Sequence, residues 1–221
     1  MRKRRRCWPG TGDKPVVKPQ VREEALANAC AVLRAGGVVA FPTETYYGLA
    51  VDPFNQAALS RLFALKGRSP DKPVLLIIDN PSQLASLVTE IPPSFPILME
   101  KFWPGPLTLV FPGAATLPEM LTGFRGTIGV RVSSHPVARQ LVRAFGRPIT
   151  ATSANFSGQS AAVAASGVLA QLGPEVDVVL DGGKTPGGLG STLLGYQEGK
   201  VCLLRVGVIS FAEIEAGLAG A

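Results

Sequence analysis

Short apolar runs alternate with helical segments along most of the chain, and this alternation limits the possible folds more than any other feature. The run at 74–78 is apolar throughout, which is typical of a strand buried on both faces of a sheet. The pattern predicts one α/β domain with a twisted mixed sheet flanked by helices. Strands are predicted at 38–41, 74–78, 107–111, 128–132, 149–151, 176–180, 191–194 and 201–204. Helices are predicted at 20–35, 55–67, 94–102, 136–145 and 161–172, with others starting at Asn80-Pro81 and at Phe211.

The net charge of +6 is concentrated at the N-terminus. Residues 1–20 hold seven Lys or Arg and one Asp, so the remainder of the 221-residue chain is neutral. We interpret residues 1–20 as a basic, disordered leader and residues 21–215 as the folded domain. A broad nucleic-acid-binding face on the domain is therefore not predicted. Organellar targeting by the leader stays open as an alternative, although the leader contains no serine.

Cysteine and histidine usage argues against a metal centre or a disulfide framework. Cys7, Cys30 and Cys202 are far apart and lack metal-ligand spacing, and His135 is the one histidine in the sequence. No apolar run approaches the roughly 20 residues of a membrane span. We therefore expect a cytoplasmic protein with reduced thiols, no membrane segment and no protein-held metal.

Polar motifs follow several predicted strands and indicate a binding pocket. The hydroxyl-rich run Pro42–Leu49 follows the first strand, and Ser153-Ala154-Asn155 follows a later one. Ligands in open α/β sheets bind at strand ends of this kind. The cations near element ends are Lys66, Arg68, Lys72, Arg131 and Arg205. The combination predicts a concave, positively charged pocket for a small anionic substrate beside a nucleotide.

Each candidate also has a purely structural interpretation. Lys66 can be a solvated cation at a helix end, and the hydroxyl runs can be ordinary turns. His135 is interpreted as a residue that starts a helix, and Trp103–Thr108 as a rigid turn. Gly183-Lys184-Thr185 does not complete a P-loop, because the required earlier glycine is absent.

The ordered set of motifs resembles the YrdC/TsaC family of threonylcarbamoyl-AMP synthases, from about residue 25 to residue 210. The matching segments are Pro42–Leu49, Lys66-Gly67-Arg68, Trp103–Thr108, Gly129-Val130-Arg131, Ser153-Ala154-Asn155, Asp181-Gly182-Gly183, Ser191-Thr192 and Leu204-Arg205. The chain resembles the short, single-domain form of the family. It departs from the family pattern at Ser133, where a proline is usual, and at Ser69, which separates the Lys-x-Arg motif from Pro70.

The resemblance implies that L-threonine, bicarbonate or CO2, and ATP accompanied by Mg2+ are converted to threonylcarbamoyl-AMP and pyrophosphate. It implies Lys66 and Arg68 as catalytic cations. The implied threonine-binding residues are Thr43, Thr127, Arg131 and Ser191, and those for ATP are Lys66, Arg68, Ser153, Asn155 and Arg205. The product would pass to a separate transferase that makes threonylcarbamoyladenosine in tRNA.

Two alternatives to a synthase remain at this stage. One is a family paralogue that binds RNA without synthase activity, and weak binding of tRNA or double-stranded RNA is also open for the synthase itself. The other is the carbamoyl-adenylate-forming domain of hydrogenase maturation proteins. Those proteins are longer and carry Cys-rich zinc motifs, which three scattered cysteines do not supply.

Overall fold

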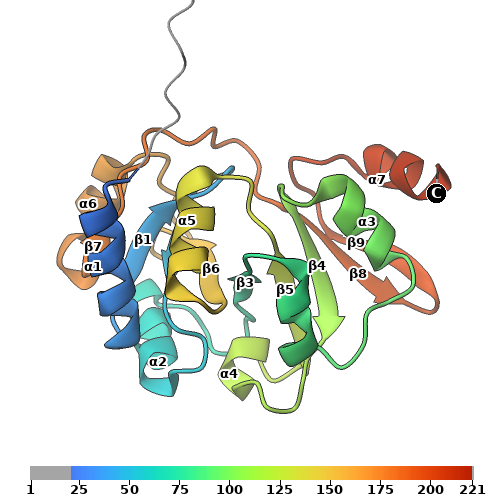
Figure 1. The fold of residues 1–221 in the computed structure, drawn as a ribbon, viewed down its shortest axis with the longest axis horizontal. Helices are drawn as coiled ribbons and strands as arrows, with labels where there is room; N and C mark the ends of the chain where they lie inside the picture. Colours follow the sequence, from blue (N-terminus) through green and yellow to red (C-terminus); the bar gives the residue numbers. More distant parts are fainter. Residues whose placement is uncertain (1–20, 221) are drawn as a thin grey trace, which may run out of the picture.

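The central element is a nine-stranded mixed sheet with the strand order β7-β1-β2-β6-β3-β5-β4-β8-β9 (Figure 1). The computed structural model describes residues 21–220, so the predicted leader lies outside the described residues. The β1–β7, β3–β5 and β4–β8 pairs are parallel and the other pairs are antiparallel. The strands are β1 (Val39–Pro42), β2 (Tyr47–Ala50), β3 (Leu75–Ile77), β4 (Leu107–Pro112), β5 (Thr127–Arg131), β6 (Ile149–Ser153), β7 (Val178–Val179), β8 (Thr192–Gln197) and β9 (Lys200–Arg205).

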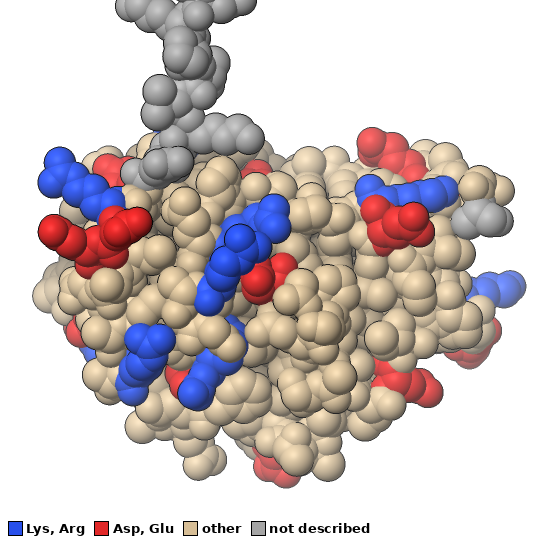
Figure 2. All heavy atoms as spheres, in the orientation of Figure 1, with Lys and Arg blue, Asp and Glu red and all other residues tan. Residues whose placement is uncertain are grey.

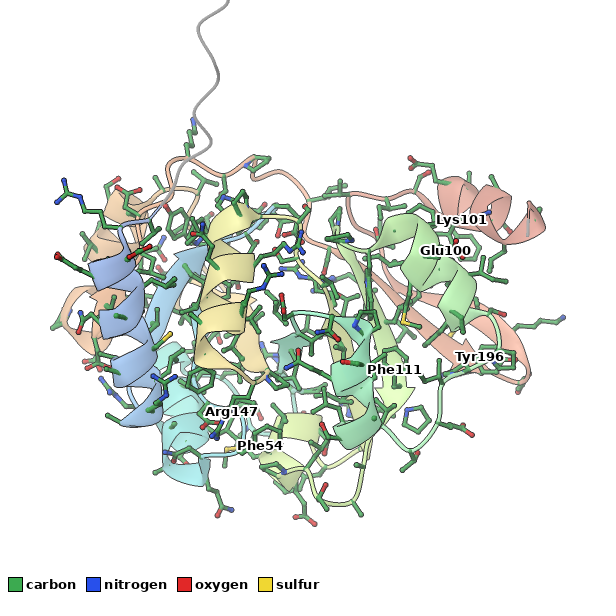
Figure 3. All side chains as sticks on the ribbon, viewed as in Figure 1. Phe54, Glu100, Lys101, Phe111, Arg147 and Tyr196 are labelled. Atoms are coloured by element: carbon green, nitrogen blue, oxygen red, sulfur yellow. The ribbon has the colours of Figure 1, made fainter. Side chains whose placement is uncertain are left out.

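Helices cover the sheet and flank its ends. Those of the α type are α1 (Glu23–Arg34), α2 (Gln56–Lys66), α3 (Phe95–Phe102), α4 (Glu119–Thr122), α5 (Pro136–Phe145), α6 (Ala165–Leu172) and α7 (Phe211–Ala219). Two 3-10 helices are η1 (Pro81–Ser86) and η2 (Gly173–Glu175). At one end of the molecule α3 packs on α7, and Lys101 of α3 donates to the carbonyl of Gly217 (Figure 3).

The alternation of side chains along residues 38–41 shows why β1 and the residue before it are apolar throughout. Val39 and Phe41 enter a cluster with α1 and α5, which lie together over one face of the sheet (Figure 1). Val38 and Ala40 enter a larger cluster that includes side chains of α2, α3, α6 and α7. All four residues are fully buried. Because both faces are covered, neither set of alternate positions can be polar.

Helix capping follows the sequence signals. Asn55 caps α2 by accepting from the backbone N–H of Ala58, as its position before the helix predicts. His135 caps α5, with Nδ1 accepting from the N–H of Val137 at 3.2 Å. Trp103 is buried, and its indole N–H donates to the carbonyl of Leu107 at 2.7 Å. The predicted structural roles of His135 and of the Trp103–Thr108 turn are therefore confirmed.

The structure differs from the predicted elements in several places. Strand β2 was not predicted, because most of its residues belong to the hydroxyl-rich run Pro42–Leu49. Pairing with β2 also extends β6 to Ser153, beyond the predicted end at residue 151. Helix α6 starts at Ala165 rather than 161, since backbone groups of Ala162 pair with Ala154 and Tyr47. The segment at Asn80-Pro81 forms a 3-10 helix, β7 is shorter than predicted, and the short α4 was missed.

None of the helices within residues 21–220 combines the length and apolarity needed to cross a bilayer. Within the same range, no three or more His, Cys, Asp and Glu side chains gather in a way that could hold a metal ion. Charged residues of both signs are scattered among uncharged ones on the face drawn in Figure 2.

Candidate functional site

A cavity of about 390 Å³ is lined by residues at or near β2, β3, β5, β6, β8 and β9. Its walls come from the β1–β2 turn, the loop after α2, the ends of β5, β6 and β9, and the start of β8. Six of the nine residues to which the resemblance assigns roles line it, namely Thr43, Arg68, Arg131, Ser153, Ser191 and Arg205, and so does the predicted cation Lys72. Folding thus gathers into one cavity residues that are far apart in the chain.

Three other predicted residues lie outside the cavity wall. Thr127 stands at the start of β5, opposite Pro112 of β4. Lys66 and Asn155 are buried beside Ser153. The predicted roles of these three toward threonine or ATP stay predictions.

Lys66 is a buried anchor for the Ser-x-Asn turn. Its ammonium donates to the carbonyls of Ser153 and Asn155, the latter at 2.7 Å, and to Asn155 Oδ1 at 3.2 Å. Ser153 Oγ donates to the same Oδ1 at 2.6 Å. The side chain of Lys66 is not a solvated helix end, since the residue is only 2% exposed. The Lys-x-Arg and Ser-x-Asn motifs therefore form one structural unit.

Burial changes the pKa of the Lys66 ammonium. Desolvation, followed by repulsion from Arg68, lowers the pKa of Lys66 from 10.5 to about 8. Near neutral pH the ammonium stays protonated and supplies three donors to the oxygens around it.

Gly67 allows the side chains of Lys66 and Arg68 to reach different places. It ends α2 in the left-handed conformation at φ 57°, which glycine adopts without strain. The side chain of Arg68 then reaches the cavity, held by Nη2 donating to the carbonyl of Pro73 at 2.8 Å and by Nε donating to that of Lys72 at 3.3 Å. Two cations that are adjacent in the motif thus face different surroundings.

Arg205 is fixed in the same manner on the opposite wall. Its Nη2 donates to the carbonyl of Ser191 at 2.8 Å and to Ser191 Oγ at 3.0 Å. The Oγ of Ser191 is also 2.8 Å from Thr108 Oγ1, which is fully buried. Burial, followed by the charge of Arg131, lowers the pKa of Arg205. Burial is also the largest cause that lowers the pKa of Arg68, to which Arg205 contributes in turn.

Arg131 differs from the other arginines because a carboxylate holds it. Its Nη1 lies 3.3 Å from Glu44 Oε1, and the two side chains are 7% and 11% exposed. Glu44 belongs to the motif Pro42–Leu49, but no role was predicted for it. An acidic residue in a turn directly after a buried strand is the signal that could have identified it.

The glycine-rich segment 182–190 packs against the β1–β2 turn. The N–H of Gly187 donates to the carbonyl of Thr45 at 2.8 Å, and the hydroxyl of Tyr46 donates to the carbonyl of Gly188 at 2.5 Å. Within the turn, Thr43 Oγ1 donates to the carbonyl of Tyr46 at 2.7 Å. These contacts fix the wall that carries the predicted hydroxyls. Tyr46 and Thr45 line the cavity as well.

The charge of the cavity wall suits an anionic ligand. The described lining contains no carboxylate and includes five cationic side chains, those of Arg68, Lys72, Arg125, Arg131 and Arg205. Arg125 was missed because it lies between short elements and outside every recognised motif. Cations and hydroxyls arranged in this way can bind phosphates and carboxylates and can stabilise charge that develops during a reaction. They do not form a carboxylate cage for a divalent metal.

Comparisons with known proteins identify the family of the chain. A family model described as "Sua5_yciO_yrdC: Telomere recombination" matches residues 31–207. A Vibrio cholerae protein named threonylcarbamoyl-AMP synthase is 45% identical over 166 residues, which cover 74% of this chain and 88% of that protein. A Pyrococcus abyssi protein of the same name is 38% identical over 199 residues, covering 90% of this chain and 58% of that protein.

A solved structure supports the same relationship. The crystal structure of P. abyssi Sua5 complexed with L-threonine has a TM-score of 0.87 and 38% identity, covering 90% of this chain and 58% of that one. The chain therefore spans little more than half the length of this relative and most of the length of the V. cholerae one.

Proposed function

The chain belongs to the Sua5/YciO/YrdC family, and from that premise we propose that it is an L-threonylcarbamoyladenylate synthase, a nucleotidyltransferase. The observation that carries the proposal is the cavity in which Arg68, Arg131 and Arg205 meet the hydroxyls of Thr43, Ser153 and Ser191. Relatives of this chain carry the synthase name, and one was solved with L-threonine.

The proposed reaction proceeds in two steps. The amine of threonine adds to CO2, which can come from bicarbonate, and releases a proton to give a carbamate. A carbamate oxygen then forms a bond to the α-phosphorus of ATP, and the bond from that phosphorus to the bridging oxygen breaks. Threonylcarbamoyl-AMP and pyrophosphate are the products. The protein's task is to position the reactants, to neutralise charge and to exclude water from a labile carbamate.

The cavity offers residues for both substrates. Thr43, Arg131 and Ser191 are proposed for threonine, together with Thr127 at the start of β5. Arg68, Arg205 and Ser153 are proposed for the phosphates, with Lys66 and Asn155 supporting them from behind the wall. Lys66 and Arg68 are the proposed catalytic cations, and Lys66 would act through the turn that it anchors. Mg2+ would enter as the ATP complex, because the lining supplies no carboxylate to hold it.

The proposed cellular role follows from the product. A mixed anhydride of this type is reactive and must pass to an acceptor, so we propose a separate transferase that modifies tRNA in the cytoplasm. Weak direct binding of tRNA or double-stranded RNA is compatible with the synthase, whereas RNA binding without adenylate formation would mark the alternative of a paralogue without synthase activity.

Substrate dependence of pyrophosphate release tests the proposal. The full chain is incubated with MgATP and bicarbonate, with threonine, serine, carbamoyl phosphate or no addition, and the adenylate is identified by mass spectrometry. We expect release that requires threonine and bicarbonate together. Equal release without threonine would overturn the synthase assignment. RNA retention on a filter with no adenylate formed would favour the paralogue instead.

A further inference from the structure

A buried hydroxyl stands behind the ion pair of Arg131 and Glu44. Ser133 Oγ donates to Glu44 Oε2 and accepts from the backbone N–H of His135 at 3.2 Å. Ser133 is fully buried, and His135 is the cap of α5. A continuous chain of polar contacts therefore runs from the start of α5 through Ser133 and Glu44 to Arg131 at the cavity.

Each member of this chain limits the freedom of the next. A carboxylate as buried as that of Glu44 has a high desolvation cost unless donors surround it. Arg131 approaches one oxygen of that carboxylate and Ser133 donates to the other. Ser133 holds Oε2 by a hydrogen bond, whereas Oε1 makes no hydrogen bond within the described residues and is held by the charge of Arg131 alone. The orientation of the carboxylate therefore limits where the guanidinium can lie.

Arg131 keeps donor capacity for a ligand. Its Nε is buried and, within the described part of the chain, makes no hydrogen bond. The residue also lines the cavity. No hydrogen bond from the guanidinium is found within the described residues, so its N–H groups can donate to a ligand. A planar carboxylate matches the geometry of such a fork and can accept two parallel hydrogen bonds from it.

We propose that Glu44 and Ser133 are positioning residues that orient the Arg131 guanidinium toward the carboxylate of the amino-acid substrate. This inference rests on the proposed function. It adds that the affinity for the amino acid depends on how Glu44 and Ser133 orient Arg131. Phosphate is the less favoured partner, because Glu44 offsets the charge of Arg131, whereas Arg68 and Arg205 are held by neutral carbonyl oxygens.

The test compares single and double variants of the full chain. Ser133→Ala removes the donor to Glu44, and Glu44→Gln removes the charge while keeping the shape. The matched control is Ser134→Ala, at an exposed neighbouring serine. For each protein we would measure the melting temperature, the KM for threonine, the KM for ATP, kcat, and the Kd for L-threonine by calorimetry.

We expect Ser133→Ala to raise the threonine KM and Kd about tenfold, the scale of one charge-assisted contact. The KM for ATP and kcat at saturating threonine should change less than about twofold. Glu44→Gln should have a larger effect in the same direction. Because Ser133 acts through Glu44, the double variant should bind threonine no more weakly than Glu44→Gln alone. Ser134→Ala should match the wild type.

Three results would overturn the inference. They are an unchanged threonine Kd in Ser133→Ala, equal rises in the KM values for threonine and ATP, and additive effects in the double variant. A lower melting temperature of a variant does not affect this test, because both KM values are measured on folded enzyme and only the difference between their changes is used. If the wild type neither binds threonine nor releases pyrophosphate with it, the proposed function fails as well. A wild type that works beside an unaffected Ser133→Ala variant defeats this inference alone.

Discussion

The cations in and directly behind the cavity wall form two regions, and they are held in opposite ways. Around Lys66, Arg68 and Arg205, the donors of the cation point at carbonyl oxygens of the backbone. Around Arg131, the cation faces the carboxylate of Glu44. Carbonyl dipoles fix a cation in place and leave its charge uncancelled, whereas a carboxylate fixes it and offsets its charge.

This difference matches the two kinds of ligand in the proposed reaction. A triphosphate carries several negative charges, and its binding benefits from uncompensated positive charge. An amino acid carries one carboxylate and one amine, so a large positive field would repel its amine. A paired arginine can still recognise the carboxylate by geometry. The carbonyl-held region is therefore proposed for ATP and the carboxylate-held region for threonine.

The largest effect is expected from removing Lys66, which anchors the carbonyl-held region. Lys66→Met keeps most of the side-chain volume but removes one donor from three acceptor oxygens. Asn155 Oδ1 and the Ser153 carbonyl each keep another donor, whereas the Asn155 carbonyl loses the Lys66 donor at 2.7 Å. We expect synthase activity to fall about 100-fold. The free energy of unfolding should fall by about 1–3 kcal/mol, measured by urea denaturation. The control is Lys200→Met, at an exposed lysine. Full activity in Lys66→Met would show that the Ser-x-Asn turn needs no anchor.

Removing a cation from the same region at the cavity wall should separate activity from stability. Arg68→Ala eliminates one charge-assisted phosphate contact, whose loss costs about 1.5–3 kcal/mol. Activity should fall about 10–100-fold, chiefly through the KM for ATP, while the melting temperature stays close to that of the wild type. Arg143→Ala is the matched control, since that side chain is 66% exposed on the surface. If the melting temperature of Arg68→Ala drops together with its activity, Arg68 is mainly structural.

A milder change probes the hydroxyls between the two regions. Thr108→Val removes the hydroxyl that lies 2.8 Å from Ser191 Oγ and preserves the volume of a fully buried side chain. Ser191 then loses one of the groups that orient it. We expect the threonine KM to rise about 3–5-fold, with a stability loss of about 1 kcal/mol. Thr89→Val, at an exposed threonine, serves as the control. If only the KM for ATP rises, Ser191 serves ATP binding rather than threonine binding.

The smallest expected effect is a dependence on pH that belongs to Lys66. Its pKa is about 8 in the folded chain and 10.5 when unperturbed, so between these values the unfolded chain binds the extra proton. The contribution of Lys66 to stability therefore rises with pH across this window. Activity should move in the opposite direction and decline a few-fold above about pH 8, as the amine loses a donor. In Lys66→Met the activity decline should disappear, which a pH series of initial rates would reveal.

Much of the architecture could be predicted from local patterns. The buried strand at 74–78 and the helix that follows Asn55 carried strong signals, and both were confirmed with small shifts at their ends. Strand β2 could not be found, because its four residues form a strand only by pairing with β1 on one side and β6 on the other. No pattern within residues 47–50 contains that information.

The sequence by itself determined the fold class, the family and the set of motifs from which the cavity is built. Periodicity and caps act over a few residues, so they can be read from the chain directly. Only the tertiary structure decided which side of the wall each cation occupies. Lys66 meets its acceptors 87 and 89 residues away, while Arg68 turns to the cavity after one left-handed glycine. Likewise, Arg131 acquires its partner Glu44 only when β5 and the β1–β2 turn come together. Burial and pairing are properties of contacts between distant segments, and no local pattern of residues encodes them.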